Sequence, residues 1–361
     1  MLNRHRDSAE FAPGTFRVLP SHRAYTPRRY IPSRLPELLR DHHSRPPRIV
    51  RFRAVSFTQH RDQQPASLQL LWRGLARISG GDKIIPAGLR EPLIDADIPD
   101  SAYFDAADTN DRPRWRCPPL DLVQETLARA ATCLDEREGE SSWNVEVHAP
   151  LLSFWVDFPI LHLASISPSN STSAQIVQAF KPKNAPSRNV DFCIMIRPQE
   201  ASPEHEAIET LCRCRHGQTI NHTDWGNLCK DPIAISIETK RQGENWDNAF
   251  LQMGTWQSAK WRSLHSGRER KLLLSSIEFM PGIIIQRHSW LFVATTLRSQ
   301  KATLHHHVAI GDTGTELTIY KLVMSLQYLQ RWVEESYWPG VQNRNPRHSL
   351  RLGMNEIPIQ P

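Results

Sequence analysis

The chain has 361 residues, a formal net charge of +6, a hydrophobic content of 39% and 27 prolines. This length allows one large domain or two small ones, and the low apolar and high proline content predicts that part of the chain lies outside a packed core. No apolar stretch is long enough to cross a bilayer and no apolar segment follows Met1, so we expect an intracellular protein, nuclear or cytoplasmic, that is neither secreted nor bound in a membrane.

Residues 1–64 are predicted to be a disordered tail rich in arginine and proline. Residues 1–62 contain 13 arginines, no lysine and five acidic residues, a charge of +8 that leaves the rest of the chain at −2. Such a tail suits phosphate contacts that are insensitive to sequence. The same composition is equally typical of a solvated tail with no binding role.

Residues 65–140 are predicted to be mainly helical. Apolar residues at three- and four-residue spacing predict a helix over residues 68–78, which the glycines at 80 and 81 end. A second helix is expected to start at Pro118-Pro119 and to continue to Leu134. Residues 82–117 between them are rich in Pro and Asp and predict a loop.

Residues 141–338 are predicted to be the α/β core of the domain, and residues 339–361 a loose C-terminal tail. The predicted elements are strands over 160–166, 189–196 and 232–240, a helix over 244–264, a hairpin of 281–286 with 290–296, and a last helix over 316–337. The three histidines at 305–307 are expected in a loop before the last helix.

The strand over residues 232–240 ends in Glu238-Thr239-Lys240. Side chains alternate between the two faces of a strand, so Glu238 and Lys240 point the same way, about 7 Å apart along the strand. A carboxylate beside an ammonium at the end of a buried strand suits a divalent cation and a phosphate oxygen. A surface ion pair of little energetic value is the competing interpretation.

Two further acids are candidates for the same site. Asp191 lies near the start of an apolar strand, where an acid is costly to bury unless it is paired or binds a metal; a turn or cap aspartate is the alternative. Glu146 is expected about one turn into a helix that Ser141 or Ser142 caps.

The chain resembles the PD-(D/E)xK nuclease superfamily, and in particular fungal proteins described as PD-(D/E)xK nuclease-like domains. The resemblance covers roughly residues 66–338. It is carried by the following motifs: Trp143-Asn144-x-Glu146-Val147-His148, Val190-Asp191, residues 221–224, the run 232–240 that ends at Glu238-Thr239-Lys240, the helix around Leu251-Gln252, and residues 281–284. Each motif is short, and their order makes the assignment specific. The resemblance implies a restriction-endonuclease-like α-β-β-β-α-β core with a mixed sheet, preceded here by extra N-terminal helices.

The resemblance also implies the roles of the site residues. Asp191, Glu238, Lys240 and Gln252 are the implied catalytic residues, and Asp191, Glu238 and Glu146 the implied ligands of Mg²⁺, with Mn²⁺ as a possible substitute. A bound cation lowers the pKa of its water, and we expect the Lys240 ammonium to stabilise charge that develops on the phosphorus, since the neighbouring acids oppose its deprotonation. The implied reaction is hydrolysis of phosphodiester bonds, with DNA as the expected partner.

Lys260 and Arg262, together with Gln252, are candidates for contacts with nucleic acid, because a basic stretch begins beside Trp256 and Trp261. A solvated helix end explains the same charges. The Cys212-x-Cys214 pair has poor spacing for zinc.

Two alternatives to a nuclease remain. The first is a catalytically inactive nuclease-like module that binds nucleic acid or a protein partner, which the near-neutral core favours. The second is a protein whose arginine-rich tail alone does the binding. The sequence gives no indication of the oligomeric state.

Overall fold

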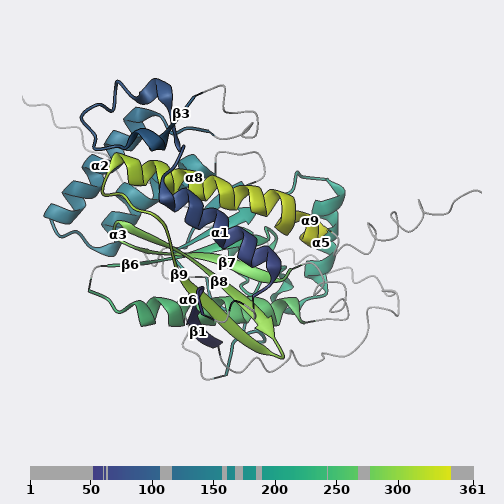
Figure 1. Ribbon diagram of the computed structural model, residues 1–361. Coiled ribbons are helices and arrows are strands. Elements are labelled where there is room, and N and C mark those ends of the chain that lie inside the picture. The colour runs from purple at the N-terminus through teal and green to yellow at the C-terminus, as the bar shows by residue number, and fades with distance from the viewer. Residues whose placement is uncertain are drawn as a thin grey trace, which may run out of the picture. The chain divides into compact units, whose positions relative to one another are not determined.

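A seven-stranded mixed β-sheet forms the centre of the fold (Figure 1). In sheet order its strands are β1 (Phe52–Ser56), β9 (Lys301–Gly311), β8 (Ser289–Arg298), β7 (Phe279–Gln286), β6 (Ile233–Lys240), β5 (Phe192–Ile196) and β4 (Leu161–Ser165). Neighbouring strands are antiparallel, except for the parallel pairs β1–β9 and β6–β7. A separate parallel pair consists of β2 (Ile85–Pro86) and β3 (Tyr103–Phe104).

The computed structural model describes residues 52–59, 61, 64–105, 116–156, 161–166, 174–183, 189–241, 243–266 and 277–342. Its α-helices are α1 (Ala66–Gly80), α2 (Leu120–Asp135), α3 (Glu140–Trp143), α4 (Ala149–Trp155), α5 (Pro203–Arg213), α6 (Trp246–Leu264), α8 (Glu316–Trp332) and α9 (Trp338–Gln342). Two π-helical segments, η6 (Asn144–His148) and η9 (Val333–Tyr337), join α3 to α4 and α8 to α9. Four short 3₁₀ turns are η3 (Ala87–Leu89), η4 (Asp100–Ala102), η7 (His216–Gln218) and η8 (Gly226–Cys229). Among the described helices, none has the length and apolarity needed to cross a membrane.

The order of these elements confirms the predicted α-β-β-β-α-β core. The helical run from α3 to α4 leads into the antiparallel strands β4, β5 and β6. Because parallel strands need a crossover connection, α6 carries the chain from the end of β6 back to the start of β7. The two predicted N-terminal helices are present as α1 and α2, and Gly81 ends α1 with a positive φ of 84°.

Helices cover both faces of the sheet: α1 and α8 lie on one side and α6 on the other (Figure 1). Strand β6 alternates between them. Ile235 and Ile237 belong to the apolar cluster on the α8 side, whereas the hydroxyl of Ser236 accepts a 3.1 Å hydrogen bond from Trp256 Nε1 of α6. Since Glu238 is two residues after Ser236, its side chain leaves the strand on the α6 side.

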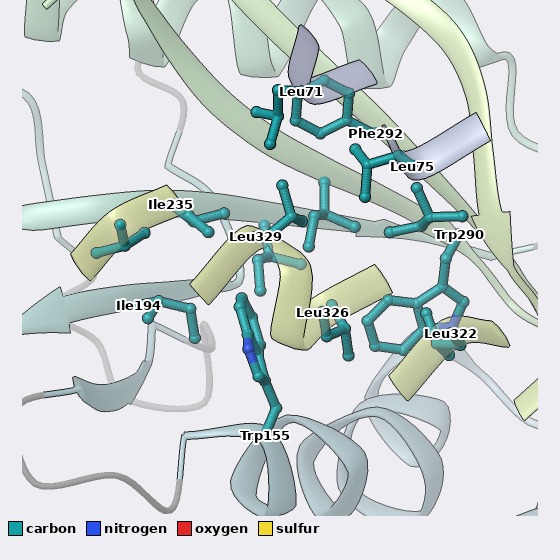
Figure 2. Packing of buried hydrophobic residues seen from close by; sticks show 14 of the residues in the cluster. Leu71, Leu75, Trp155, Ile194, Ile235, Trp290, Phe292, Leu322, Leu326 and Leu329 are labelled. Carbon is teal, nitrogen blue, oxygen red and sulfur yellow. The ribbon is translucent and has the colours of Figure 1, made fainter. Parts of the chain in front are cut away.

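The α8 side of the sheet holds the larger apolar cluster. Figure 2 shows Leu329 of α8 close to Ile235 of β6, Leu326 further along α8, and Trp155 of α4 beside Ile194 of β5. All five side chains are buried, and full burial of such a side chain stabilises the fold by about 1.5–3 kcal/mol. The cluster therefore gives the end of β6 a rigid support.

The predicted boundary of the tail at residue 64 is wrong for residues 52–59. Strand β1 pairs with residues 302–306 of β9, and Phe57 just after it is 1% exposed and stacks on Phe292 at 5.5 Å between ring centroids. The strand is short, lies at the edge of the sheet and contains an exposed arginine. Its sequence therefore looks like that of the arginine-rich tail before it. The predicted start of the loose C-terminal tail at residue 339 is also wrong, because residues 339–342 belong to α9 and Val341 is 6% exposed. Residues 1–51, 60, 62, 63 and 343–361 lie outside the described residues.

The prediction of a loop at residues 305–307 is also wrong. These histidines lie inside β9, with His305 and His306 buried and His307 exposed at a φ of 77°. A bulge between β8 and β9 accompanies this irregular backbone. The strand was not predicted because three consecutive histidines lack the alternation of apolar and polar residues that indicates a strand.

Candidate active site

Glu238 and Lys240 lie at the end of β6, as predicted, with their side chains in contact. The side chain of Glu238 is 0% exposed and that of Lys240 10% exposed. The Lys240 ammonium donates one hydrogen bond to Glu238 Oε1 and another, of 2.8 Å, to the carbonyl of Thr239. The pair is therefore a buried ion pair rather than a surface one.

Asp191 immediately precedes β5 and lies beside the end of β6. Phe192 stands opposite Ile237 in the sheet, and the Asp191 amide donates a 3.0 Å hydrogen bond to the Ile237 carbonyl. The Asp191 side chain accepts two hydrogen bonds on Oδ2, from the Thr239 amide at 2.7 Å and from the Thr239 hydroxyl at 3.0 Å. The pairing of β5 with β6 thus joins two acids that are 47 positions apart in the sequence.

Burial and mutual repulsion decide the charges of the two acids. Burial raises the pKa of Glu238 well above its ordinary value, and the negative charge of Asp191 raises it further, against the effect of Lys240. Burial also raises the pKa of Asp191, although the hydrogen bond from the Thr239 amide opposes the shift. Both acids resist ionisation, and a cation that binds between them would stabilise their ionised forms.

Lys240 remains an ammonium ion in this environment. Burial acts to lower the pKa of Lys240, but the charges of Glu238, Glu140 and Asp191 together outweigh burial and raise it. A lysine with a raised pKa is a poor general base and a good source of positive charge.

Helix α3 brings Glu140, and not Glu146, to the acid pair. Glu140 Oε2 lies 4.0 Å from Lys240 Nζ, and burial followed by the charge of Asp191 raises the pKa of Glu140. Glu146 instead forms an ion pair with Arg129 of α2, and its side chain is 46% exposed. Helix α3 begins after Gly139 without a side-chain cap, which is earlier than the predicted serine cap. Glu140 and Glu146 are six residues apart, which is about 1.7 helical turns, so they lie on different sides of the helix.

Gln252 of α6 is half-buried, and its Nε2 donates a 2.6 Å hydrogen bond to the carbonyl of Asn189. This bond fixes the segment that leads into Asp191 against α6. The structure therefore brings Gln252 into contact with the segment just before Asp191.

The burial of Lys260 and Arg262 contradicts their predicted role in binding nucleic acid. Lys260 is 3% exposed, donates to the carbonyl of Ile233 and lies 5.2 Å from the ring centroid of Tyr337. Arg262 is 8% exposed. The last half of α6 is buried on nearly all sides, so these charges are enclosed rather than solvated. The basic residues that follow in the sequence, Arg268, Arg270 and Lys271, lie outside the described residues.

The two cysteines of the Cys212-x-Cys214 pair lie in different environments. Cys212 is buried, with its thiol 3.4 Å from the carbonyl of Cys229, and Cys214 is exposed.

The acid pair fits a hard divalent cation. Glu238 Oε2 is buried and has no hydrogen-bond partner among the residues that the structure describes. Within that same part of the chain no three His, Cys, Asp or Glu side chains converge as a complete metal cluster. Mg²⁺ does not need one, because it is commonly held by one or two carboxylates with water and substrate phosphate as the other ligands.

Sequence reasoning missed two members of the site. Glu140 was missed because the start of its helix was placed too late, and Thr239 because its role depends on the neighbouring strand. The alternation of strand residues did signal that Thr239 differs in direction from Glu238 and Lys240.

A mixed sheet with an acid just before β5 and an acid and a lysine at the end of the adjacent β6 is consistent with the class of restriction-endonuclease-like α/β folds. Residues 89–338, more than half of the chain, match the family described as the PD-(D/E)XK nuclease superfamily, and the chain belongs to this superfamily. Comparisons with curated proteins and with solved structures gave no significant match.

Proposed function

We propose that the protein is a Mg²⁺-dependent nuclease that hydrolyses phosphodiester bonds of DNA, inside the nucleus or the cytoplasm. The observation that carries the proposal is the buried Oε2 of Glu238, next to Asp191 and Lys240, for which the described part of the chain offers no hydrogen-bond partner. A protein gains nothing in stability from an acid in this position, so the arrangement favours a bound cation.

Asp191 and Glu238 would hold the cation, and Glu140 is the proposed third acid in place of Glu146. Held by these acids, a divalent cation would supply polarisation of the scissile phosphate and activation of a water nucleophile. Mn²⁺ also accepts carboxylate ligands and is expected to substitute for Mg²⁺.

Lys240 would stabilise the charge that develops on the phosphate oxygens during attack. Its ammonium is held by Glu238 and by the Thr239 carbonyl, so it is already oriented before substrate binds. Gln252 would act through Asn189, by fixing the chain that presents Asp191.

The second candidate function is a nuclease-like module that binds nucleic acid or a protein but does not cut. The burial of Lys260 and Arg262 favours it, since these two charges are withheld from a phosphate backbone. In that case the arginine-rich N-terminal segment would supply the phosphate contacts.

The test uses the purified full chain with linear and supercoiled DNA, and with RNA, in Mg²⁺, Mn²⁺ or EDTA. We expect cleavage in Mg²⁺ and Mn²⁺, none in EDTA, and a loss of about 10²–10³-fold in Lys240→Ala, the usual effect of removing one charge-stabilising donor. Lys230→Ala is the matched control, because Lys230 lies on the surface and pairs with Glu209.

A chain that lacks residues 1–51 separates the two candidates, since the deletion ends before β1. Cleavage retained by this chain supports the nuclease. If the full chain does not cut DNA with either metal, and the shortened chain no longer binds DNA, the protein is a binding module and the proposed nuclease is refuted.

A further inference from the structure

A buried chain of hydrogen bonds leads from the β7–β8 turn to Asp191. His148 Nε2 lies 3.0 Å from the Arg287 carbonyl, and His148 Nδ1 lies 2.9 Å from Asn144 Oδ1. Asn144 Nδ2 donates a 3.0 Å bond to the Thr239 hydroxyl, which donates to Asp191 Oδ2. Four side chains from three separate segments of the chain thus form one continuous path.

The path is enclosed by protein. Asn144, His148 and Thr239 are all buried, and the rings of Trp143 and Trp290 lie 5.8 Å and 5.6 Å from the imidazole. In a low-dielectric interior a hydrogen bond between satisfied groups is strong, and an unpaired group is costly. The network therefore holds each of its members in one orientation.

The helix supplies its two members from a π-helical segment, η6, in which Asn144 and His148 are one turn apart. Wider π turns that interrupt α-helices are frequent at functional sites. On the strand, Thr239 lies between Glu238 and Lys240, so the network passes through β6 between these two residues of the proposed site before it reaches Asp191.

Counting protons shows which bonds of the path depend on the tautomer of His148. Burial lowers the pKa of His148 to about 4, so the ring is neutral at pH 7 and carries one N–H. When that proton is on Nδ1, His148 donates to Asn144, Asn144 to Thr239 and Thr239 to Asp191, and only the contact with the Arg287 carbonyl lacks a proton. With the proton on Nε2, His148 instead donates to the Arg287 carbonyl; in both tautomers Asn144 donates to the Thr239 hydroxyl and Thr239 to Asp191.

Both hydrogen bonds that Asp191 accepts on its side chain within the described residues end on Oδ2. One carboxylate oxygen is therefore fixed by Thr239, and the other is left for a ligand. Residues that orient a metal-binding side chain commonly change metal affinity by about 10–100-fold when they are replaced.

We infer that Thr239, Asn144 and His148 are positioning residues that hold the Asp191 carboxylate in the orientation needed to bind a divalent cation. The inference rests on the proposed metal-dependent function and adds to it a chain of residues that touch neither cation nor substrate. Asn144 and His148 act through Thr239.

The experiment is a calorimetric titration of the full chain with Mn²⁺ alone, in the absence of DNA. We expect Thr239→Val, which removes the hydroxyl and keeps the shape, to bind Mn²⁺ about 10–100-fold more weakly, and Thr239→Ser to restore wild-type affinity. Asn144→Ala is expected to weaken binding to a similar extent. Val145→Ala is the control, because Val145 lies in the same π segment with its side chain in solvent.

Asp191→Asn separates the inference from the proposed function. If Asp191→Asn binds Mn²⁺ as tightly as the wild type, the proposed metal site itself is wrong. If Asp191→Asn loses binding while folded Thr239→Val and Asn144→Ala bind normally, the metal site stands and the positioning network is refuted. Circular dichroism and thermal melting establish folding, and Asn144→Ala decides the question should Thr239→Val not fold.

Discussion

Glu238 and Lys240 form an ion pair in which the acid is fully buried and the amine is almost so. The second oxygen of the acid has no partner within the described residues, and burial raises the pKa of Glu238. The pair by itself is therefore an incomplete arrangement, which a cation next to Glu238 and Asp191 would complete.

Metal binding is expected to stabilise the fold through this acid. Because a ligand that binds only the folded state adds RT ln(1 + [L]/Kd), Mg²⁺ at about 100 times its Kd adds about 2.7 kcal/mol and raises the melting temperature by several degrees. Glu238→Gln removes the charge, so its melting temperature should not respond to Mg²⁺. Differential scanning calorimetry with and without Mg²⁺ measures both. An equal response of wild type and variant would contradict the assignment of Glu238 as a ligand, and Glu209→Gln, a surface substitution, is the control.

The pH dependence of stability is expected to carry the signature of His148. Its pKa is about 4 in the folded protein, against an ordinary value of 6.5, so the unfolded chain binds more protons between these values. The contribution of His148 is fully present above pH 6.5 and is lost as the pH falls toward 4. The full difference corresponds to about 3 kcal/mol.

Urea unfolding of wild type and His148→Gln at intervals between pH 4 and 7 checks this sign. The wild type should lose stability more steeply on acidification than the variant. Burial also lowers the pKa of His288, next to the Arg287 carbonyl, but His288 is present in both proteins and cancels in the comparison. A parallel pair of curves would show that His148 is not a buried neutral ring.

Strand β1 is expected to be part of the folded domain. Phe57 is buried against Phe292, so Phe57→Ala should cost about 3–5 kcal/mol, the usual effect of removing a buried aromatic ring. Gln59→Ala, two residues later and exposed, should have little effect. Chemical denaturation measures both. Deletion of residues 1–51 should leave the unfolding midpoint unchanged, whereas deletion of residues 1–59 should lower it strongly.

Lys260 is expected to act on stability and not on DNA binding. Its ammonium donates to the Ile233 carbonyl inside the protein, and loss of such a partner costs about 1–3 kcal/mol. Lys260→Ala should therefore lower the melting temperature while the DNA affinity of the folded protein stays the same. Arg241→Ala, at an exposed position, is the control for stability. A fluorescence anisotropy titration that finds weaker DNA binding at unchanged stability would reverse this assignment.

Local patterns were sufficient for most of the elements. The apolar spacing of α1 and α2, the glycine that ends α1, and the β-branched run of β6 each depend on neighbours along the chain. The register that places Glu238 and Lys240 on one side follows from the two-residue period of a strand. Strand β1 was missed because an edge strand derives its order from its partner, β9, and not from a pattern of its own.

The sequence by itself determined which acids and which lysine were available, and the face of β6 on which two of them lie. Only the tertiary structure decided that Asp191 lies beside the end of β6, near enough for its charge to act on Glu238, that Glu140 rather than Glu146 lies beside Lys240, and that Lys260 is enclosed. The physical reason is that these relationships depend on strand pairing across long sequence separations and on the rotation of a helix about its axis. Local periodicity contains neither, because a shift of one residue at the start of a helix turns every side chain by about 100°.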